Sequence, residues 1–142
     1  MYQKLVIVGN LGRDPEMRYT PSGQAVTNFS VATTRVWYDN NSQKQEETTW
    51  FRVSTWGKLA ETCNQYLSKG RQVLIEGRLT QDKETGGPRI WTDQSGQPRA
   101  SFEITALEVK FLGTRGDSGT GDAGSGDDFS HAPGMTEDEI PF

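Results

Sequence analysis

The chain has 142 residues, of which 32% are hydrophobic, and its formal net charge at pH 7 is −4. Residues 1–112 carry 14 basic and 12 acidic groups, whereas residues 113–142 carry 1 basic and 7 acidic groups, so the two parts have net charges of +2 and −6. The negative charge of the whole chain is therefore no argument against a polyanionic partner for residues 1–112. We expect no signal peptide, because the N-terminal stretch is too short and too polar for one. We expect no membrane segment, because no apolar run reaches membrane-spanning length.

The first part of the chain predicts three strands separated by turns. A β-rich run at 4–8 is followed by Asp14-Pro15 and Pro21-Ser22-Gly23, which predict turns within residues 12–23. The longest strand candidate is 28–37, with Phe29 and Val31 on one face. A polar segment at 39–42 then predicts a loop or a hairpin tip that leads into a strand at 48–56.

The segment 50–56 alternates with period two, as a strand with two different faces does. Phe51, Val53 and Thr55 fall on one face, which we expect to point into a core. The other face carries Trp50, Arg52, Ser54 and Trp56. Two indoles beside a guanidinium on a solvent-facing side form a surface on which unpaired nucleobases can stack. A strand that is buried on both faces is the alternative.

The second part predicts one helix and two further strands. The helical face after Gly57 consists of Leu59, Cys63, Tyr66 and Leu67. We expect Lys69 in the last turn of this helix and Gly70 as its C-cap. The polar insert 80–99 predicts a loop or an extended hairpin between strands at 72–79 and 102–111. Gly77 predicts a bulge or a sharp bend, and the apolar residues of the last strand change parity after Ala106, which predicts a bulge or a crossing between sheets.

This order of elements predicts the fold class. Three strands, a helix and two more strands are typical of an all-β, five-stranded OB-fold barrel with one helix between strands 3 and 4. We expect residues 1–112 to form this domain. Residues 113–136 are rich in glycine and aspartate without periodicity, so we expect a disordered linker, followed by an acidic tip at 137–142.

Four tryptophans are the candidate stacking residues: Trp37, Trp50, Trp56 and Trp91. Basic residues lie close to them in the sequence: Arg35, Arg52, Lys58, Arg89 and Arg99. Stacking on indoles tolerates any base, and phosphate contacts add a term that depends on salt, so the combination predicts binding without base preference. Trp37 shares parity with Phe29 and Val31, which requires either a bend before Trp37 or a position beyond the regular strand. Core packing is the alternative for each indole.

The last residues predict a second functional element. The chain ends in Glu137, Asp138, Glu139, Ile140, Pro141 and Phe142. A solubilising tail has no use for two apolar residues, whereas a terminal aromatic ring with its carboxylate suits a pocket with a basic residue on a partner protein. The acidic residues would steer the tip to a basic surface. A solvated tail with chance apolar residues is the alternative.

Catalysis is poorly supported, and we expect neither enzyme activity nor a metal or other cofactor. His131 is the only histidine and lies in the tail, and Cys63 occupies a helical core position. A single cysteine cannot form an internal disulfide and is typical of a reducing cytosol. The acids outside the tail that could gather magnesium have no motif spacing: Asp14, Glu16, Asp82, Glu84 and Asp93.

The chain closely resembles the bacterial single-stranded DNA-binding protein (SSB) family over its whole length. The matching runs are LVIVGNLGRDPEMRY at 5–19, GKLAE at 57–61, YLSKG at 66–70, VLIEGRL at 73–79, WTDQSG at 91–96 and the acidic terminus ending in IPF. Two departures stand out. Trp56 occupies a position where phenylalanine is common, and the loop at 82–90 is longer than expected, which leaves the position of Trp91 open.

The resemblance implies an OB-fold homotetramer that wraps single-stranded DNA without sequence preference during replication, recombination and repair, in the cytoplasm. It places the stacking aromatics on the four tryptophans, and the basic contacts on Arg18, Arg52, Lys58, Lys69 and Arg71. It also implies that the tip recruits replication and repair proteins. Three other functions stay open: an RNA-binding OB module of the cold-shock kind, a metal-dependent nuclease, and an adaptor that uses only its tail.

Overall fold

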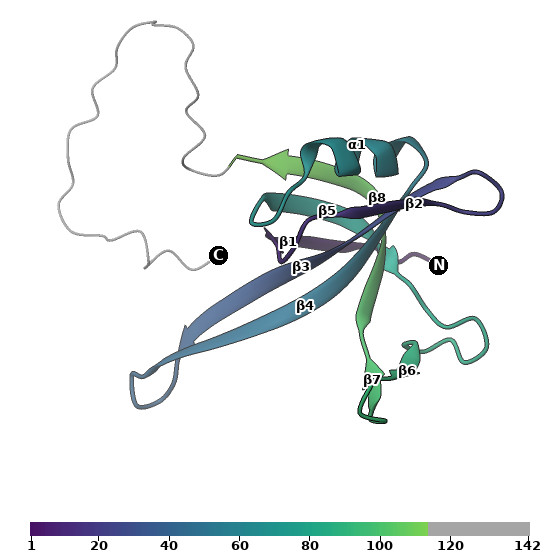
Figure 1. The fold of residues 1–142 in the computed structure, drawn as a ribbon. Coiled ribbons are helices and arrows are strands. Elements are labelled where there is room, and N and C mark those ends of the chain that lie inside the picture. Colours follow the sequence, from purple (N-terminus) through teal and green to yellow (C-terminus); the bar gives the residue numbers. More distant parts are fainter. Residues whose placement is uncertain (114–142) are drawn as a thin grey trace, which may run out of the picture.

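The computed structural model describes residues 1–113 and contains eight strands and one helix in this part of the chain (Figure 1). In chain order they are β1 (Leu5–Leu11), β2 (Glu16–Tyr19), β3 (Ala25–Tyr38), β4 (Lys44–Trp56), α1 (Lys58–Tyr66), β5 (Gln72–Leu79), β6 (Ile90–Thr92), β7 (Pro98–Ala100) and β8 (Phe102–Leu112). Within residues 1–113 no helix has both the length and the apolar character needed to cross a membrane. The predicted linker from residue 114 on and the predicted tip at 137–142 lie outside the described residues.

Five strands close into a barrel. The strand order is β1-β5-β8-β4-β3-β2, and β1 also pairs with β3, which closes the sheet on itself. β4 and β8 are parallel, whereas the other pairs in the barrel are antiparallel. Since β2 only adds to β3, the barrel strands are β1, β3, β4, β5 and β8, and α1 lies between the third and the fourth of them in the chain. The predicted OB-fold order is therefore confirmed.

A strand that the sequence did not predict lies between the two turns expected within residues 12–23. Glu16–Tyr19 forms β2, which pairs with β3 from Glu16↔Asn28 to Tyr19↔Ala25. The predicted turns lie on either side of this strand. The strand was missed because four residues between two turn signals are too few to show an alternating pattern.

The β3–β4 hairpin is longer than the predicted strands 28–37 and 48–56. Its ladder runs in continuous register from Val26↔Trp56 to Tyr38↔Lys44, and residues 39–43 form the tip, as expected. Figure 1 shows that the far half of this hairpin extends well beyond the barrel. We call this half, residues 33–49, the β3–β4 arm. The predicted hairpin within 80–99 is also present, as β6 and β7.

The core lies inside the barrel and under α1. The fully buried valine and isoleucine side chains come from four barrel strands: Val26, Val31, Val53, Val73, Ile75 and Ile104. Cys63 of α1 is also fully buried, and Thr27 Oγ1 donates a 2.7 Å hydrogen bond to the carbonyl of Ala60. This bond satisfies the hydroxyl of Thr27, which is buried at the contact with α1.

The helix ends earlier than predicted. α1 stops at Tyr66, and Leu67 is its C-cap in an extended conformation, with its N–H bonded to the Cys63 carbonyl. Leu67 is only 6% exposed and belongs to the core. The chain therefore leaves the helix to bury Leu67, and Gly70, with φ of 85°, belongs to the turn before β5 instead of capping the helix.

The parity change in the last strand is explained by a bulge. Glu76 pairs with Glu108, but Gly77 pairs with Ala106, so Leu107 is an extra residue in β8 and is 70% exposed. A side chain cannot fit at Gly77, because a Cβ there would lie 2.3 Å from the Thr105 carbonyl oxygen. Beyond the bulge the inward-facing residues have odd numbers. Both the bulge predicted at Gly77 and the bulge predicted in the last strand are confirmed at this one irregularity.

Candidate nucleic-acid interface

The end of β4 has the two faces that the sequence predicts. Val53 and Thr55 are fully buried, and Phe51 is half-buried with its ring centroid 5.8 Å from that of Phe102. On the other face, Trp50 is 54% exposed and Trp56 is 41% exposed. Because this face is open to water and its two indoles flank Arg52, the alternative of a strand buried on both faces is wrong for β4.

The Trp50 ring lies directly on Gly12. A Cβ at Gly12 would lie 2.5 Å and 2.8 Å from two carbons of the indole, so only glycine leaves room for the ring in this position. The Gly12 N–H donates to the Ser30 carbonyl at 3.0 Å, which fixes the segment after β1 against β3. A small open pocket is lined by Gly12, Arg13, Ser30 and Trp50. The ring therefore has one supported side and one side that is accessible to a ligand.

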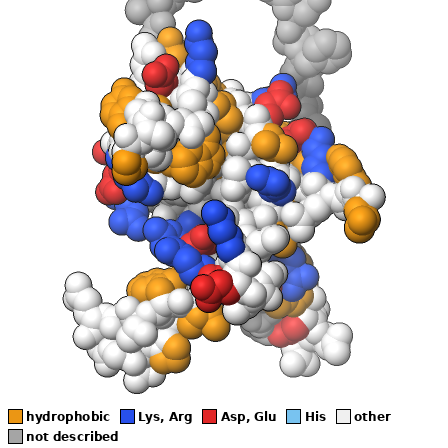
Figure 2. All heavy atoms as spheres, turned by 90° about the vertical axis from the view of Figure 1, so that its right-hand side faces the viewer, with side chains coloured by type: hydrophobic (Ala, Val, Ile, Leu, Met, Phe, Trp, Pro, Cys, Tyr) orange, Lys and Arg blue, Asp and Glu red, His pale blue; other side chains and the backbone are white. Residues whose placement is uncertain are grey.

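A groove with a volume of about 760 Å³ runs beside Arg52, over β2, β3 and β4 and under the segment 80–89. Its cationic lining residues are Arg13, Arg18, Arg52, Lys83 and Arg89. Its carboxylates are Asp14, Glu16, Asp82, Glu84 and Glu103. Figure 2 shows Lys and Arg side chains gathered across the middle of one face with acidic side chains among them. The groove thus offers several phosphate ligands but is not uniformly basic.

The structure places three of the eight predicted basic contacts in this groove: Arg18, Arg52 and Arg89. Arg89 also forms an ion pair with Glu103 at 2.9 Å, which ties the long loop before β6 to β8. Sequence reasoning missed Arg13 and Lys83. Arg13 lies inside the run at 5–19 that carries the family resemblance, so that run contained a signal for it.

Trp37 lies on the β3–β4 arm and not in the barrel. Its ladder partner is Gln45, whereas the partner of Trp50 is Ala32, so the two indoles belong to opposite faces of one continuous ladder. Trp37 lies on the same side of β3 as the core residues Phe29 and Val31. The arm extends past the core, so this side of the strand is exposed at Trp37. The guanidinium of Arg35 covers one face of the Trp37 ring, with Cζ 4.3 Å from the ring centroid. Arg35 also pairs with Glu47 at 3.2 Å.

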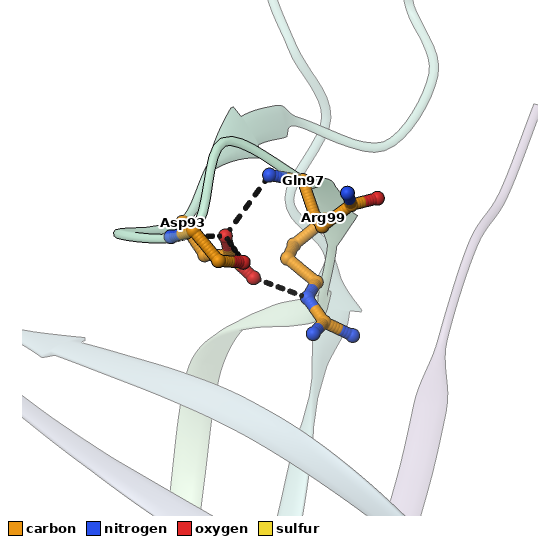
Figure 3. A network of polar contacts seen from close by, with 4 residues as sticks. Asp93, Gln97 and Arg99 are labelled. Atoms are coloured by element: carbon orange, nitrogen blue, oxygen red, sulfur yellow. Dashed lines mark hydrogen bonds and ion pairs between the residues drawn. The ribbon is translucent and has the colours of Figure 1, made fainter.

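Trp91 lies in β6 and is 39% exposed, so it belongs to a hairpin strand and not to an irregular loop. Its direct cross-strand partner in β7 is Arg99. Asp93 accepts hydrogen bonds from the N–H groups of Ser95 and Gln97 and pairs with Arg99 Nε at 2.8 Å (Figure 3). Hydrogen bonds from Ser95, then from Arg99 and Gln97, lower the pKa of Asp93 to about 2. Asp93 therefore stays ionised and holds this turn together.

Three predicted basic contacts lie away from the groove. Lys58 begins α1, and Lys69 and Arg71 lie in the segment between α1 and β5. None of the three lines the groove of about 760 Å³. The backbone N–H of Lys69 donates to Asp14 Oδ1 at 2.8 Å, so Asp14 connects this turn to the segment before β2.

No metal or nucleophilic centre is found in the described part of the chain. No group of three or more His, Cys, Asp or Glu side chains within residues 1–113 could hold a metal ion. Cys63 packs in the core, as predicted, and burial raises the pKa of its thiol to about 11. A neutral, inaccessible thiol is not a nucleophile.

The model of the "Single-strand binding protein family" matches residues 2–112, which include every described strand and the helix. The chain belongs to the single-strand binding protein family. This membership confirms the resemblance seen in the sequence and the expectation that the chain is not an enzyme.

Two relatives illustrate the similarity. The chain is 44% identical over 118 residues to a single-stranded DNA-binding protein of Neisseria meningitidis, and 45% identical over 119 residues to single-stranded DNA-binding protein 1 of Chlorobaculum tepidum. Each match covers 83% of this chain. The first match spans 64% of the length of the Neisseria protein, and the other match spans 68% of the length of the Chlorobaculum protein.

Solved structures share the fold. The Plasmodium falciparum SSB in complex with ssDNA has a TM-score of 0.66 and 27% identity, over 80% of this chain and 97% of that one. A deletion mutant of the single-stranded DNA binding protein from Thermus aquaticus has a TM-score of 0.62 and 27% identity, over 81% of this chain and 52% of that one. These similarities confirm the OB-fold barrel.

Proposed function

We propose that the protein binds single-stranded DNA without sequence preference, by stacking bases on its exposed indoles and pairing phosphates with arginines and lysines. The observation that carries this proposal is the exposed Trp50 ring in a small pocket that shares Arg13 and Ser30 with the arginine-lined groove. Membership of the family and the similarity to an SSB that was solved with ssDNA support it.

The arrangement suits single strands better than duplexes. Stacking on aromatic side chains contributes about 1–3 kcal/mol per base and works with every base, but it needs bases whose faces are free. Phosphate contacts add affinity that falls as salt rises. Stacking residues on β4, on the β3–β4 arm and on β6 allow one strand to be held at several points.

A fluorescence titration of the full chain with oligo-dT tests this proposal. We expect strong quenching of tryptophan emission by the single strand and weaker binding at higher salt. Duplex DNA of the same length should quench little, because its bases are already stacked on one another. Absence of quenching by oligo-dT would contradict the proposal, and equal affinity for ribose oligomers would favour an RNA-binding module instead.

We also propose that the chain forms a homotetramer, with β1 as one contact. β1 pairs with β5 over Leu5–Asn10 but reaches β3 only at Asn10 and Leu11, so its other edge is unpaired over residues 5–9 in the described part of the chain. Val6 and Val8 are about half exposed beside this edge. An open strand edge with apolar side chains is a site at which another chain can add a strand.

Two further parts of the proposal concern residues and surroundings outside the described structure. The tip at 137–142 recruits replication and repair proteins through its acidic residues, its ring and its terminal carboxylate. The protein acts in the cytoplasm, on single strands exposed during replication, recombination and repair. The family resemblance supports both statements.

A further inference from the structure

One face of the Trp37 ring is already covered by the chain itself. Arg35 and Glu47 are direct cross-strand partners, and Trp37 lies two positions beyond Arg35, so the three side chains share one face of the ladder. Arg35 Cζ lies 4.3 Å from the ring centroid, and Arg35 Nη2 donates to Glu47 Oε2 at 3.2 Å. Carboxylate, guanidinium and indole are therefore in contact in that order.

We propose that Glu47 is a positioning residue that competes with a DNA phosphate for Arg35. The inference rests on the proposed binding of single-stranded DNA. A phosphate and a carboxylate make the same charge-assisted hydrogen bonds to a guanidinium, so one can replace the other. While Glu47 holds Arg35, the charge of the guanidinium is partly neutralised by the carboxylate, and the guanidinium covers one face of the Trp37 ring. A phosphate that replaces Glu47 as the partner of Arg35 gains this charge for DNA binding.

The exposure of the pair makes this exchange feasible. The side chains of Arg35 and Glu47 are 70% and 58% exposed, and ion pairs between such side chains are weakly held. Arg52, beside Trp50, forms no ion pair within residues 1–113. Within the described part of the chain, single-stranded DNA would therefore find an unpaired guanidinium, that of Arg52, on the barrel, and a guanidinium already paired with a carboxylate, that of Arg35, on the β3–β4 arm.

The test compares Glu47→Gln with a matched control, Glu46→Gln. Both variants remove one negative charge from β4, but Glu46 pairs with Val36 on the opposite face of the ladder from Arg35. Oligo-dT binding by the full chain is measured over a range of salt concentrations, for both variants and for each combined with Arg35→Gln. Circular dichroism checks that every variant is folded.

We expect E47Q to bind oligo-dT about two- to fivefold more tightly than the wild type at low salt. Its slope of log K against log salt should be steeper by about 0.7 for each chain that the strand contacts. E46Q should stay close to the wild type. R35Q should cost more affinity in the E47Q background than in the wild type, because only there is the charge of Arg35 already available.

Two results would overturn the inference and leave the proposed function standing: equal gains in E46Q and E47Q, or equal losses from R35Q in both backgrounds. Failure of the wild type to bind oligo-dT would overturn both proposals. A merely structural role of Glu47 would change stability without changing the salt slope.

Discussion

At the scale of single residues, the position of Trp50 depends on a residue that has no side chain. The indole lies where a Cβ at Gly12 would be, and the Gly12 backbone is held to β3 through Ser30. The ring is thus supported before a base arrives. A stacking platform that is already ordered loses less entropy on binding than a mobile one.

Gly12→Ala should therefore weaken DNA binding more than folding. The added methyl displaces the Trp50 ring, and we expect the affinity for oligo-dT to fall about fivefold or more, the equivalent of one weakened base contact. Gly87→Ala is the matched control, because its Cβ would meet no atom closer than 3.7 Å. The measurement is the oligo-dT titration together with urea unfolding. Unchanged affinity in G12A would show that the ring does not need this support.

Sequence parity was sufficient to place Trp50 and Trp56 outside the barrel, because alternation is a local property of a strand. The contacts of Gly12 and Arg35 could not be predicted in the same way. Each depends on which residue of another segment comes to lie opposite, and for Arg35 that requires the register of β3 with β4. The eight predicted basic residues were chosen by their nearness in sequence to indoles or by resemblance, and only three of them line the groove.

At the scale of elements, the β6–β7 hairpin relies on one carboxylate. β6 and β7 have three residues each and, in the described part of the chain, pair only with one another, so the hairpin has few backbone hydrogen bonds of its own. Asp93 connects the turn at Ser95 and Gln97 to Arg99. The orientation of Trp91, which is opposite Arg99, follows from this network.

We expect the hairpin to loosen in acid with a midpoint near the pKa of Asp93. This pKa is lowered from 3.8 to about 2, so the stabilisation by Asp93 is complete above pH 3.8 and is lost as the pH falls through about 2. The NMR signal of the Trp91 indole N–H, followed from pH 5 to pH 1, measures the change. Asp93→Asn should remove this transition, and a midpoint near 3.8 in the wild type would contradict the role of the network.

The elements that the sequence did not predict are the ones decided by tertiary contacts. β2 is a strand because β3 offers it an edge, and α1 ends early because the core has room for Leu67. The long strands β3, β4 and β8 were all predicted, because each contains enough residues to show the alternation of a strand. The predicted ranges of β3 and β4 were too short, and that of β8 was correct to within one residue. The bulge at Leu107 was visible because an insertion changes the parity of every residue after it.

At the scale of the whole molecule, the open edge of β1 separates the single chain from the proposed assembly. The barrel is closed at Asn10 and Leu11, but within residues 1–113 the preceding residues of β1 pair on one side only. Closed barrels avoid exposed edges, so the open edge next to Val6 and Val8 is the feature on which the proposed assembly rests.

Replacing both valines with lysine should break this contact. The double variant V6K/V8K places two like charges beside the edge of each copy, and we expect the mass from light scattering to fall below four chain masses. Ile90→Lys is the control, because Ile90 is 70% exposed on β6, in a sheet separate from β1. An unchanged mass in V6K/V8K would exclude β1 as an assembly contact.

The burial of Cys63 has a practical consequence for labelling the protein with a fluorophore. It is the only thiol in the chain, it is fully covered by the core, and it remains protonated at neutral pH. Maleimide dyes react with accessible thiolates, so the native chain should remain unlabelled at pH 7. A cysteine introduced at Asn41, at the exposed tip between β3 and β4, would then take up one fluorophore per chain without any change to Cys63.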